Sequence, residues 1–246
     1  MTTVFFHGLR GAFRLRSAVV LATPGFRADL SQDHVPEALV TEVAAQDVRG
    51  KQDPASLLGA LAARELTAAS PAADDDPFSR GVFVSTRRGN QRSVRAFAGA
   101  LAAGRRSPST FSVAGYNIVA QSTARELAAR GPSVVLAGQR ATLDGALFLA
   151  ALRLGSGAIR TGYVGHVTWL PDATGRSGEG LAVLAAVEHV DSAVSVSEQH
   201  VVALAPADLY APRGTDGPGG APAAEDFAAA HRVAPLLADA RTAGVR

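Results

Sequence analysis

The sequence predicts an α/β fold in which helices pack on a mainly parallel sheet. Along most of the chain, apolar segments of strand length alternate with segments whose apolar residues recur at helical spacing. Of the 246 residues, 47% are hydrophobic and 19% are charged, a balance typical of a domain that buries a sizeable core. No apolar run approaches the roughly 18–20 residues that a membrane span needs. We therefore expect buried strands and no membrane partner.

Seven segments have the length and composition of strands. They are 4–6, 17–22, 81–85, 134–137, 161–170, 181–188 and 200–204. We expect 200–204 to pair antiparallel with 181–188. We assign residues 1–204 to one domain, the Pro-, Gly- and Ala-rich residues 205–225 to a linker, and residues 226–246 to a helical tail.

Five further segments have helical spacing of apolar residues. Asp53 is a good N-cap and Pro54 a good first helical residue, so a helix begins there. The segment 92–103 has an apolar face and is followed by Gly104. The remaining expected helices cover 35–48, 117–130 and 142–153.

Composition excludes several classes of function. The chain has no cysteine, so it forms no disulfide, thiolate zinc site or iron–sulfur cluster and carries no Cys nucleophile. Its six His have no tight ligand spacing, and no phosphate-binding or dinucleotide motif is present, so we expect no metal and no cofactor. A net charge of +2 with scattered Arg argues against nucleic-acid binding. The N-terminus lacks a signal-peptide pattern, which predicts a cytoplasmic location.

The segment 131–145 predicts a buried strand, a sharp Gly-containing elbow and the start of an apolar helix. Many acyl-transfer enzymes hold a nucleophile at such an elbow, where the helix N-terminus stabilises a developing anion. Here the elbow carries Gln139 and Arg140, which cannot form a thioester.

The segment 81–169 resembles the N-terminal half of β-ketoacyl synthases, which have the thiolase fold. Its most specific part runs from Arg130 to Asp144, and the later Gly178-Glu179-Gly180 resembles the Gly-Glu-Gly segment of that family. Within the family, Gln139 followed by Leu143-Asp144 resembles the chain-length factor, in which Gln replaces the active-site Cys. Arg140 departs from that pattern, and an ungapped alignment puts Arg140 at the Cys position instead.

The resemblance implies a thiolase-like layered fold with a reduced C-terminal half. At 246 residues, and without the His motifs of ketosynthases, the chain looks like a shortened chain-length factor of the kind associated with highly reducing or aryl-polyene type II polyketide synthases. It implies a non-catalytic subunit, in a heterodimer with a Cys-bearing ketosynthase that condenses malonyl units. The acyl carrier protein is expected to bind mainly through that ketosynthase.

By the same resemblance, Gln139 and Arg140 mark the vestigial nucleophile position. Five residues are candidates for the acyl tunnel or the subunit interface: Phe111, Tyr116, Val119, Thr142 and Leu143. Core packing is the simpler account of the apolar ones, above all of Leu143, whose helical period places it on an apolar face.

Two other functions stay open. The chain could be a small independent α/β enzyme for acyl transfer or hydrolysis that uses a Ser or His nucleophile, and Ser85, Ser112 and Ser133 lie near the elbow in sequence. It could instead be a carrier-protein-binding module, in which Arg87, Arg88, Arg105 and Arg106 contact an acidic carrier. His166 and Trp169 lie near the end of a predicted strand, and a lone His in such a place is usually structural.

Overall fold

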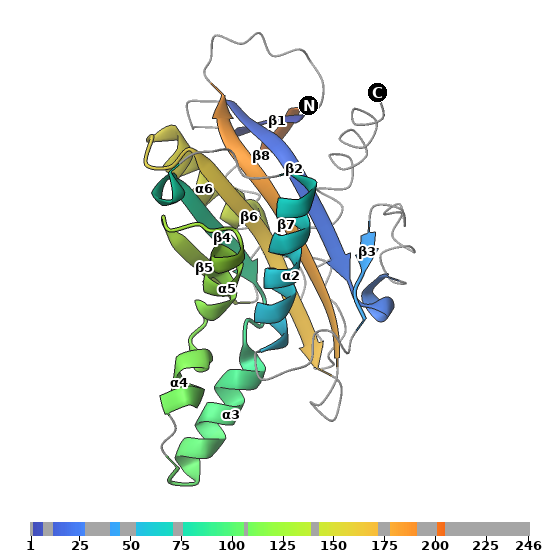
Figure 1. The fold of residues 1–246 in the computed structure, drawn as a ribbon, viewed down its shortest axis with the longest axis vertical. Coiled ribbons are helices and arrows are strands. Elements are labelled where there is room, and N and C mark those ends of the chain that lie inside the picture. Colours follow the sequence, from blue (N-terminus) through green and yellow to red (C-terminus); the bar gives the residue numbers. More distant parts are fainter. Residues whose placement is uncertain are drawn as a thin grey trace.

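A computed structural model describes the chain at residues 2–6, 12–27, 40–44, 53–70, 76–105, 108–138, 143–171, 178–190 and 201–204. These residues form a mixed α/β fold, as predicted, around one eight-stranded sheet (Figure 1). The strand order is β5-β4-β6-β7-β2-β1-β8, and β3 pairs with β2 outside this path. The strands are β1 (Thr2–Phe6), β2 (Ala12–Ala22), β3 (Val40–Glu42), β4 (Arg80–Thr86), β5 (Ser133–Ala137), β6 (Thr161–Pro171), β7 (Gly178–Val190) and β8 (Val201–Leu204).

Helices cover both faces of this sheet. On one face, α2 (Pro54–Ala69) and α5 (Ile118–Glu126) pack against alternate residues of the strands, among them Val82, Val84 and Trp169. On the other face, α6 (Leu143–Gly155) packs against the intervening residues, including Phe83 and Val164. Successive side chains of a strand point to opposite faces, so each buried strand contributes to both cores.

The sheet is less parallel than the sequence predicts. β5, β4 and β6 are parallel neighbours, whereas β6, β7, β2 and β1 follow one another in antiparallel pairs. Only the six residues 172–177 separate β6 from β7 in the chain, too few for the crossover that a parallel pair requires. A long antiparallel ribbon therefore makes up the middle of the sheet.

Two local predictions are wrong. Residues 40–42 of the expected 35–48 helix form β3, which runs parallel to Val20–Ala22 at the end of β2. Val40 and Thr41 are β-branched, and such residues favour strands. The end of β2 provides a strand with which they pair, and a local sequence pattern does not show such a partner. β8 pairs in parallel with β1 rather than antiparallel with β7. The predicted linker and helical tail, 205–246, lie outside the described residues.

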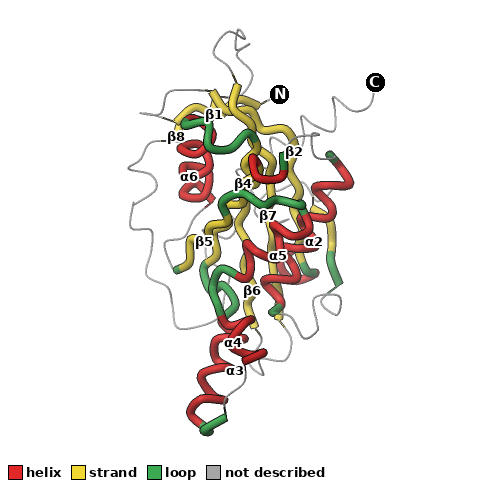
Figure 2. The backbone as a smooth tube through the Cα atoms, turned by 60° about the vertical axis from the view of Figure 1, so that its left-hand side comes forward, coloured by secondary structure: helices red, strands yellow, loops and turns green. Residues whose placement is uncertain are grey.

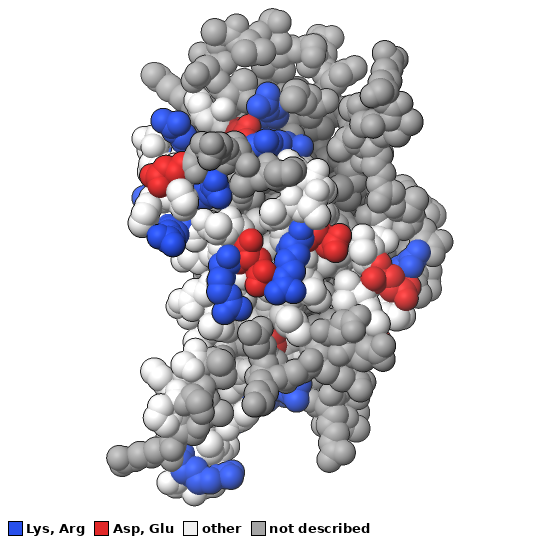
Figure 3. Space-filling view, in the orientation of Figure 1, with Lys and Arg blue, Asp and Glu red and all other residues white. Residues whose placement is uncertain are grey.

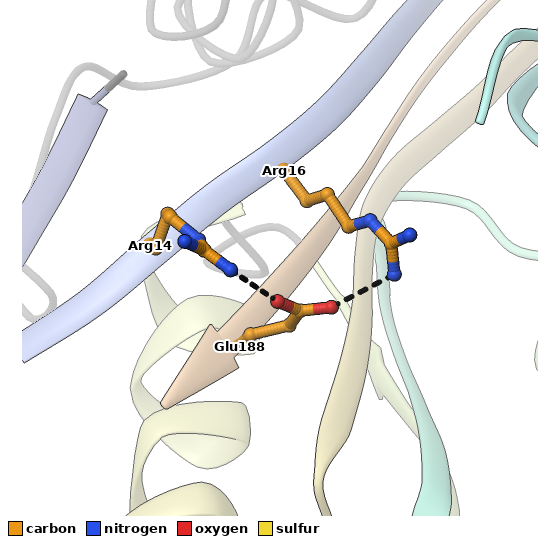
Figure 4. A network of polar contacts seen from close by, with 3 residues as sticks. All are labelled: Arg14, Arg16 and Glu188. Carbon is orange, nitrogen blue, oxygen red and sulfur yellow. Dashed lines mark hydrogen bonds and ion pairs between the residues drawn. The ribbon is translucent and has the colours of Figure 1, made fainter. Parts of the chain in front are cut away.

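The long antiparallel pair of β2 and β7 contains a β-bulge, beside which three charged side chains form ion pairs. The register shifts between Leu15 and Ser17, which leaves Arg16 as the extra residue. Glu188 on β7 then contacts both Arg14 at 3.0 Å and Arg16 at 2.9 Å (Figure 4). These side chains are partly exposed, so the two ion pairs add modestly to stability.

Two further helices extend away from the sheet. These are α3 (Gln91–Ala102) and α4 (Pro108–Ala114), and both project beyond the end of the strands (Figures 1 and 2). The sequence predicts α3 closely, but α4 was not expected. Although α3 has an apolar face, none of its residues is buried.

Candidate functional site

The predicted elbow begins in an exposed part of the sheet edge. β5 enters it after Gly131, whose N–H donates to the Arg80 carbonyl at 3.0 Å. A Cβ at this position would lie 2.4 Å from that carbonyl oxygen and 2.7 Å from the Phe78 carbonyl oxygen, so only glycine fits. Beyond this close approach, β5 runs parallel to β4, with Val82 opposite Ser133 and Thr86 opposite Ala137.

The strand ends at a glycine that turns the chain. Gly138 has φ of 130°, a conformation that side chains rarely adopt, and its N–H donates to the Thr86 carbonyl at 3.1 Å. The next described residue, Leu143, begins α6 and is buried in the core between α6 and the sheet. Gln139, Arg140 and Thr142 lie outside the described residues, so their roles stay predictions.

Within the described part of the chain, no strand pairs with the outer edge of β5. Among the described strands, β5 pairs with β4 alone. The N–H of Val82 donates to the Pro132 carbonyl, and the N–H of Gly138 donates to the Thr86 carbonyl, so the even-numbered residues of β5 bond to β4. By the alternation of a parallel ladder, the N–H and C=O of Val135 point away from β4.

Two candidate residues lie on or beside α4 and are exposed. Phe111 is 68% exposed, and its ring lies 5.5 Å from the ring of Phe97 on α3. Tyr116 is 51% exposed and lies over Gly89, where a Cβ would come within 2.8 Å of its ring. Neither side chain is therefore part of a core formed by the described residues.

Val119 has a different setting. It lies on α5 and is fully buried in the core between α5, α2 and the sheet. Leu143 and Val119 thus both pack inside the described fold, on opposite faces of the sheet. Their assignment to a tunnel or interface stays a prediction.

The fold brings together a serine and a histidine that are 81 residues apart. Ser85 on β4 pairs with His166 on β6, and its Oγ lies 2.9 Å from His166 Nδ1. The Ser85 hydroxyl also lies 3.2 Å from the Gly165 carbonyl oxygen. Both side chains are fully buried, so this pair resembles a satisfied polar contact of the core.

The base of α3 contains polar contacts that the sequence did not reveal. Asp53 Oδ1 accepts from the Ala55 N–H at 3.1 Å, which confirms the predicted N-cap of α2. Its Oδ2 accepts from the N–H and the hydroxyl of Ser93 in the first turn of α3. Burial raises the pKa of the Asp53 carboxyl, although the hydrogen bonds from Ser93 and Ala55 and the nearby Arg92 charge act in the opposite direction.

Metal and membrane features are missing from the part of the chain that the structure describes. No cluster of three or more His, Cys, Asp or Glu that could hold a metal ion occurs in these ranges. None of the described helices has the length and apolar character needed to cross a membrane.

A scan against protein-family models finds no match, and a search of curated proteins finds none either. Solved structures do give similarities. A ketosynthase (ApeO) in complex with its chain length factor (ApeC) from Xenorhabdus doucetiae is 15% identical, with a TM-score of 0.49, over 73% of this chain and 80% of that chain. The ishigamide ketosynthase/chain length factor is 20% identical, with a TM-score of 0.47, over 70% of this chain and 50% of that chain.

Ketosynthase twelve from the bacillaene polyketide synthase of Bacillus amyloliquefaciens is also similar. It is 14% identical, with a TM-score of 0.47, over 72% of this chain and 41% of that chain. The chain thus spans half or less of the second and third structures.

Proposed function

We propose that this chain is a non-catalytic chain-length factor that pairs with a Cys-bearing ketosynthase and shapes the acyl tunnel of a type II polyketide synthase. The partner supplies the thiolate and carries out the decarboxylative condensation of malonyl units. This chain has no cysteine of its own. The acyl carrier protein reaches the pair mainly through the ketosynthase.

The single observation that carries the proposal is the outer edge of β5. Its sequence, Ser-Val-Val-Leu-Ala, contains neither a charge nor a proline, the devices by which proteins protect exposed strand edges. Its residues are exposed or half-buried, in contrast to the wholly buried neighbour β4. An apolar edge of this kind favours pairing with a strand of another chain.

The position of this edge suits the proposed role. β5 leads directly into the elbow, so a partner strand on β5 lies beside the position at which the family holds its nucleophile. The exposed Phe111 and Tyr116 supply further apolar surface. A stable heterodimer of this type commonly buries more than about 2,000 Å², and a five-residue strand provides only part of that area.

Co-expression with the ketosynthase encoded beside this chain tests the proposal. We expect the two proteins to co-purify and to migrate together in size-exclusion chromatography with light scattering. Absence of any complex, at concentrations at which both proteins are folded, refutes the proposed function.

A proline at Val135 tests the edge itself. The Val135→Pro variant removes an N–H that faces away from β4, so it leaves the hydrogen bonds between β5 and β4 in place. The variant loses the hydrogen bond from the N–H of residue 135 to the partner strand, and the proline ring hinders strand pairing. We expect both effects together to weaken the complex by about tenfold. Val135→Ala is the matched control, because it also shortens the side chain but keeps the N–H. Equal binding by both variants contradicts pairing through β5.

A further inference from the structure

The segment 87–117, which we call the helical arm, lies outside both cores of the fold. It contains α3, α4 and the residues that flank them, and it is described except at 106 and 107. No described residue of the arm belongs to the core on either face of the sheet. None of the residues of α3 is buried, whereas β4, the strand that leads into the arm, is buried throughout. Among the described elements, α3 packs mainly against α4.

The two helices of the arm bury little apolar surface between them. The rings of Phe97 and Phe111 lie 5.5 Å apart, yet Phe111 is 68% exposed and Leu101 is 51% exposed. The arm holds six arginines and no acidic residue, so no ion pair forms within it. Figure 3 shows basic side chains at its far end. A segment with so little buried apolar surface should open at a low cost in free energy.

The two ends of the arm meet at one place. The Asn90 side-chain amide donates to the Gly115 carbonyl at 3.0 Å, and so joins the start of the arm to its end. The ring of Tyr116 lies over Gly89, whose φ is 54°. Because the chain enters and leaves the arm here, a change of a few backbone angles at this place moves both helices together.

The start of α3 depends on a carboxyl group from another helix. Asn90 occupies the N-cap position of α3, but its side chain forms no capping hydrogen bond. Asp53 supplies that bond, because its Oδ2 accepts from the Ser93 N–H at 3.3 Å and from the Ser93 hydroxyl at 3.1 Å. Ser93 is the third residue of α3, whose N–H a capping side chain usually binds. We call this contact between Asp53 and Ser93 the base contact.

We propose that the helical arm is a hinged unit, which opens while the sheet stays folded, and that the base contact holds it closed. Opening breaks the hydrogen bonds from Ser93 to Asp53 and exposes little apolar surface, whereas unfolding of the sheet exposes both cores. Phe111 moves with the arm, so the position of this candidate for the tunnel or interface depends on the base contact. The inference concerns this chain alone and does not require the proposed partner.

Hydrogen–deuterium exchange of the full chain, followed by mass spectrometry, tests the hinged unit in wild type. We expect the amides of α3 to exchange about a hundredfold faster than those of β4, because only the arm has to open. In low concentrations of urea, exchange in β4 should accelerate more steeply than exchange in α3. The reason is that the dependence on urea grows with the surface that each opening exposes.

The Asp53→Ser variant tests the base contact. Serine caps a helix about as well as aspartate does, so the start of α2 keeps a side-chain acceptor. Serine has a single side-chain oxygen, so the second acceptor, which binds Ser93, is lost. We expect the amides of α3 to exchange about tenfold faster than in wild type, and those of β4 to exchange as before.

Asp76→Ser is the matched control. Asp76 is also an N-cap that a proline follows, and its Oδ1 accepts from the N–H two residues on, that of Phe78, at 3.1 Å. It lies outside the arm, so we expect the exchange of α3 to stay as in wild type.

Four results would overturn the inference. In wild type, these are exchange of α3 at the rate and urea dependence of β4, which means that the arm opens only with the whole fold, and exchange of α3 as fast as an unstructured peptide. With the variants, they are an acceleration of α3 by Asp53→Ser no greater than that by Asp76→Ser, and an equal acceleration of α3 and β4 by Asp53→Ser.

Discussion

The carboxylate of Asp53 joins α2, which packs on one face of the sheet, to α3, which projects beyond the ends of the strands (Figure 1). Its Oδ1 caps α2 through the Ala55 N–H, while its Oδ2 lies 3.3 Å from the Ser93 N–H nitrogen and 3.1 Å from the Ser93 hydroxyl. The side chain is almost fully buried. This contact ties the start of α3 to the body of the fold.

The buried Asp53 should make stability depend on pH in an unusual direction. Burial raises its pKa, so the folded state holds the proton more tightly than the unfolded state does. Its contribution to stability is therefore fully present below the ordinary aspartate pKa of about 4 and is lost as pH rises through the raised pKa. Urea unfolding over this pH range should show the advantage of wild type over Asp53→Asn shrinking as pH rises. If the stability difference between wild type and Asp53→Asn stays constant or grows as pH rises, the raised pKa of Asp53 is contradicted.

A methyl group at Gly180 should destabilise the fold. A Cβ there would lie 2.6 Å from Trp169 Cε3 and 2.9 Å from Leu58 Cδ2, both in the core between α2 and the sheet. We expect Gly180→Ala to lower the free energy of unfolding by about 1–3 kcal/mol in denaturant titrations.

Gly99→Ala is the matched control for this effect. Nothing lies within 4 Å of a Cβ at residue 99 in α3, and alanine favours a helix by up to about 1 kcal/mol relative to glycine. We expect no loss of stability in this variant. Equal destabilisation by both substitutions contradicts the packing described for Gly180.

Ser85 and His166 should act as structural residues. Both are fully buried, so an ester substrate does not reach the Ser85 hydroxyl. Ser85→Ala leaves the buried His166 without this partner, and we expect a loss of about 1–3 kcal/mol in the free energy of unfolding. We also expect no esterase activity in wild type. Turnover of a p-nitrophenyl ester by wild type that Ser85→Ala abolishes favours the independent hydrolytic enzyme.

The volume of Phe111 should affect product length if this side chain closes the tunnel. In the reconstituted ketosynthase pair, Phe111→Ala opens space at the proposed contact, so we expect longer products by mass spectrometry. Phe78→Ala is the matched control, since Phe78 is 62% exposed and lies outside α3 and α4. Identical product distributions for wild type and both variants contradict a role for Phe111 in setting chain length.

Local sequence patterns predicted most elements of the fold, because capping and periodicity depend on neighbouring residues. The start of α2 follows from Asp53 and Pro54, and the apolar run of β4 marks a strand buried on both faces. α4 was missed because Pro108–Ala114 is short and carries little helical period. The expected helix at 117–130 ends earlier, where Ala128 adopts φ of 50°.

The candidate site was predicted only in part. The elbow was found from the order of a strand, a glycine and an apolar helix, which the structure confirms on both sides of the undescribed residues 139–142. The contacts between Ser85 and His166, and between Asp53 and Ser93, were not predicted. Each joins residues 40 or more positions apart, and no local pattern encodes such a distance.

By itself, the sequence determined the alternation of strands and helices, the lack of any thiol and the basic charge of the segment 87–117. Only the tertiary structure decided that β3 and β8 pair with β2 and β1, and that Leu101, Phe111 and Tyr116 are exposed. The physical reason is that backbone propensity and charge belong to each residue. Strand pairing and burial belong instead to pairs of segments, whose meeting depends on the path of the whole chain.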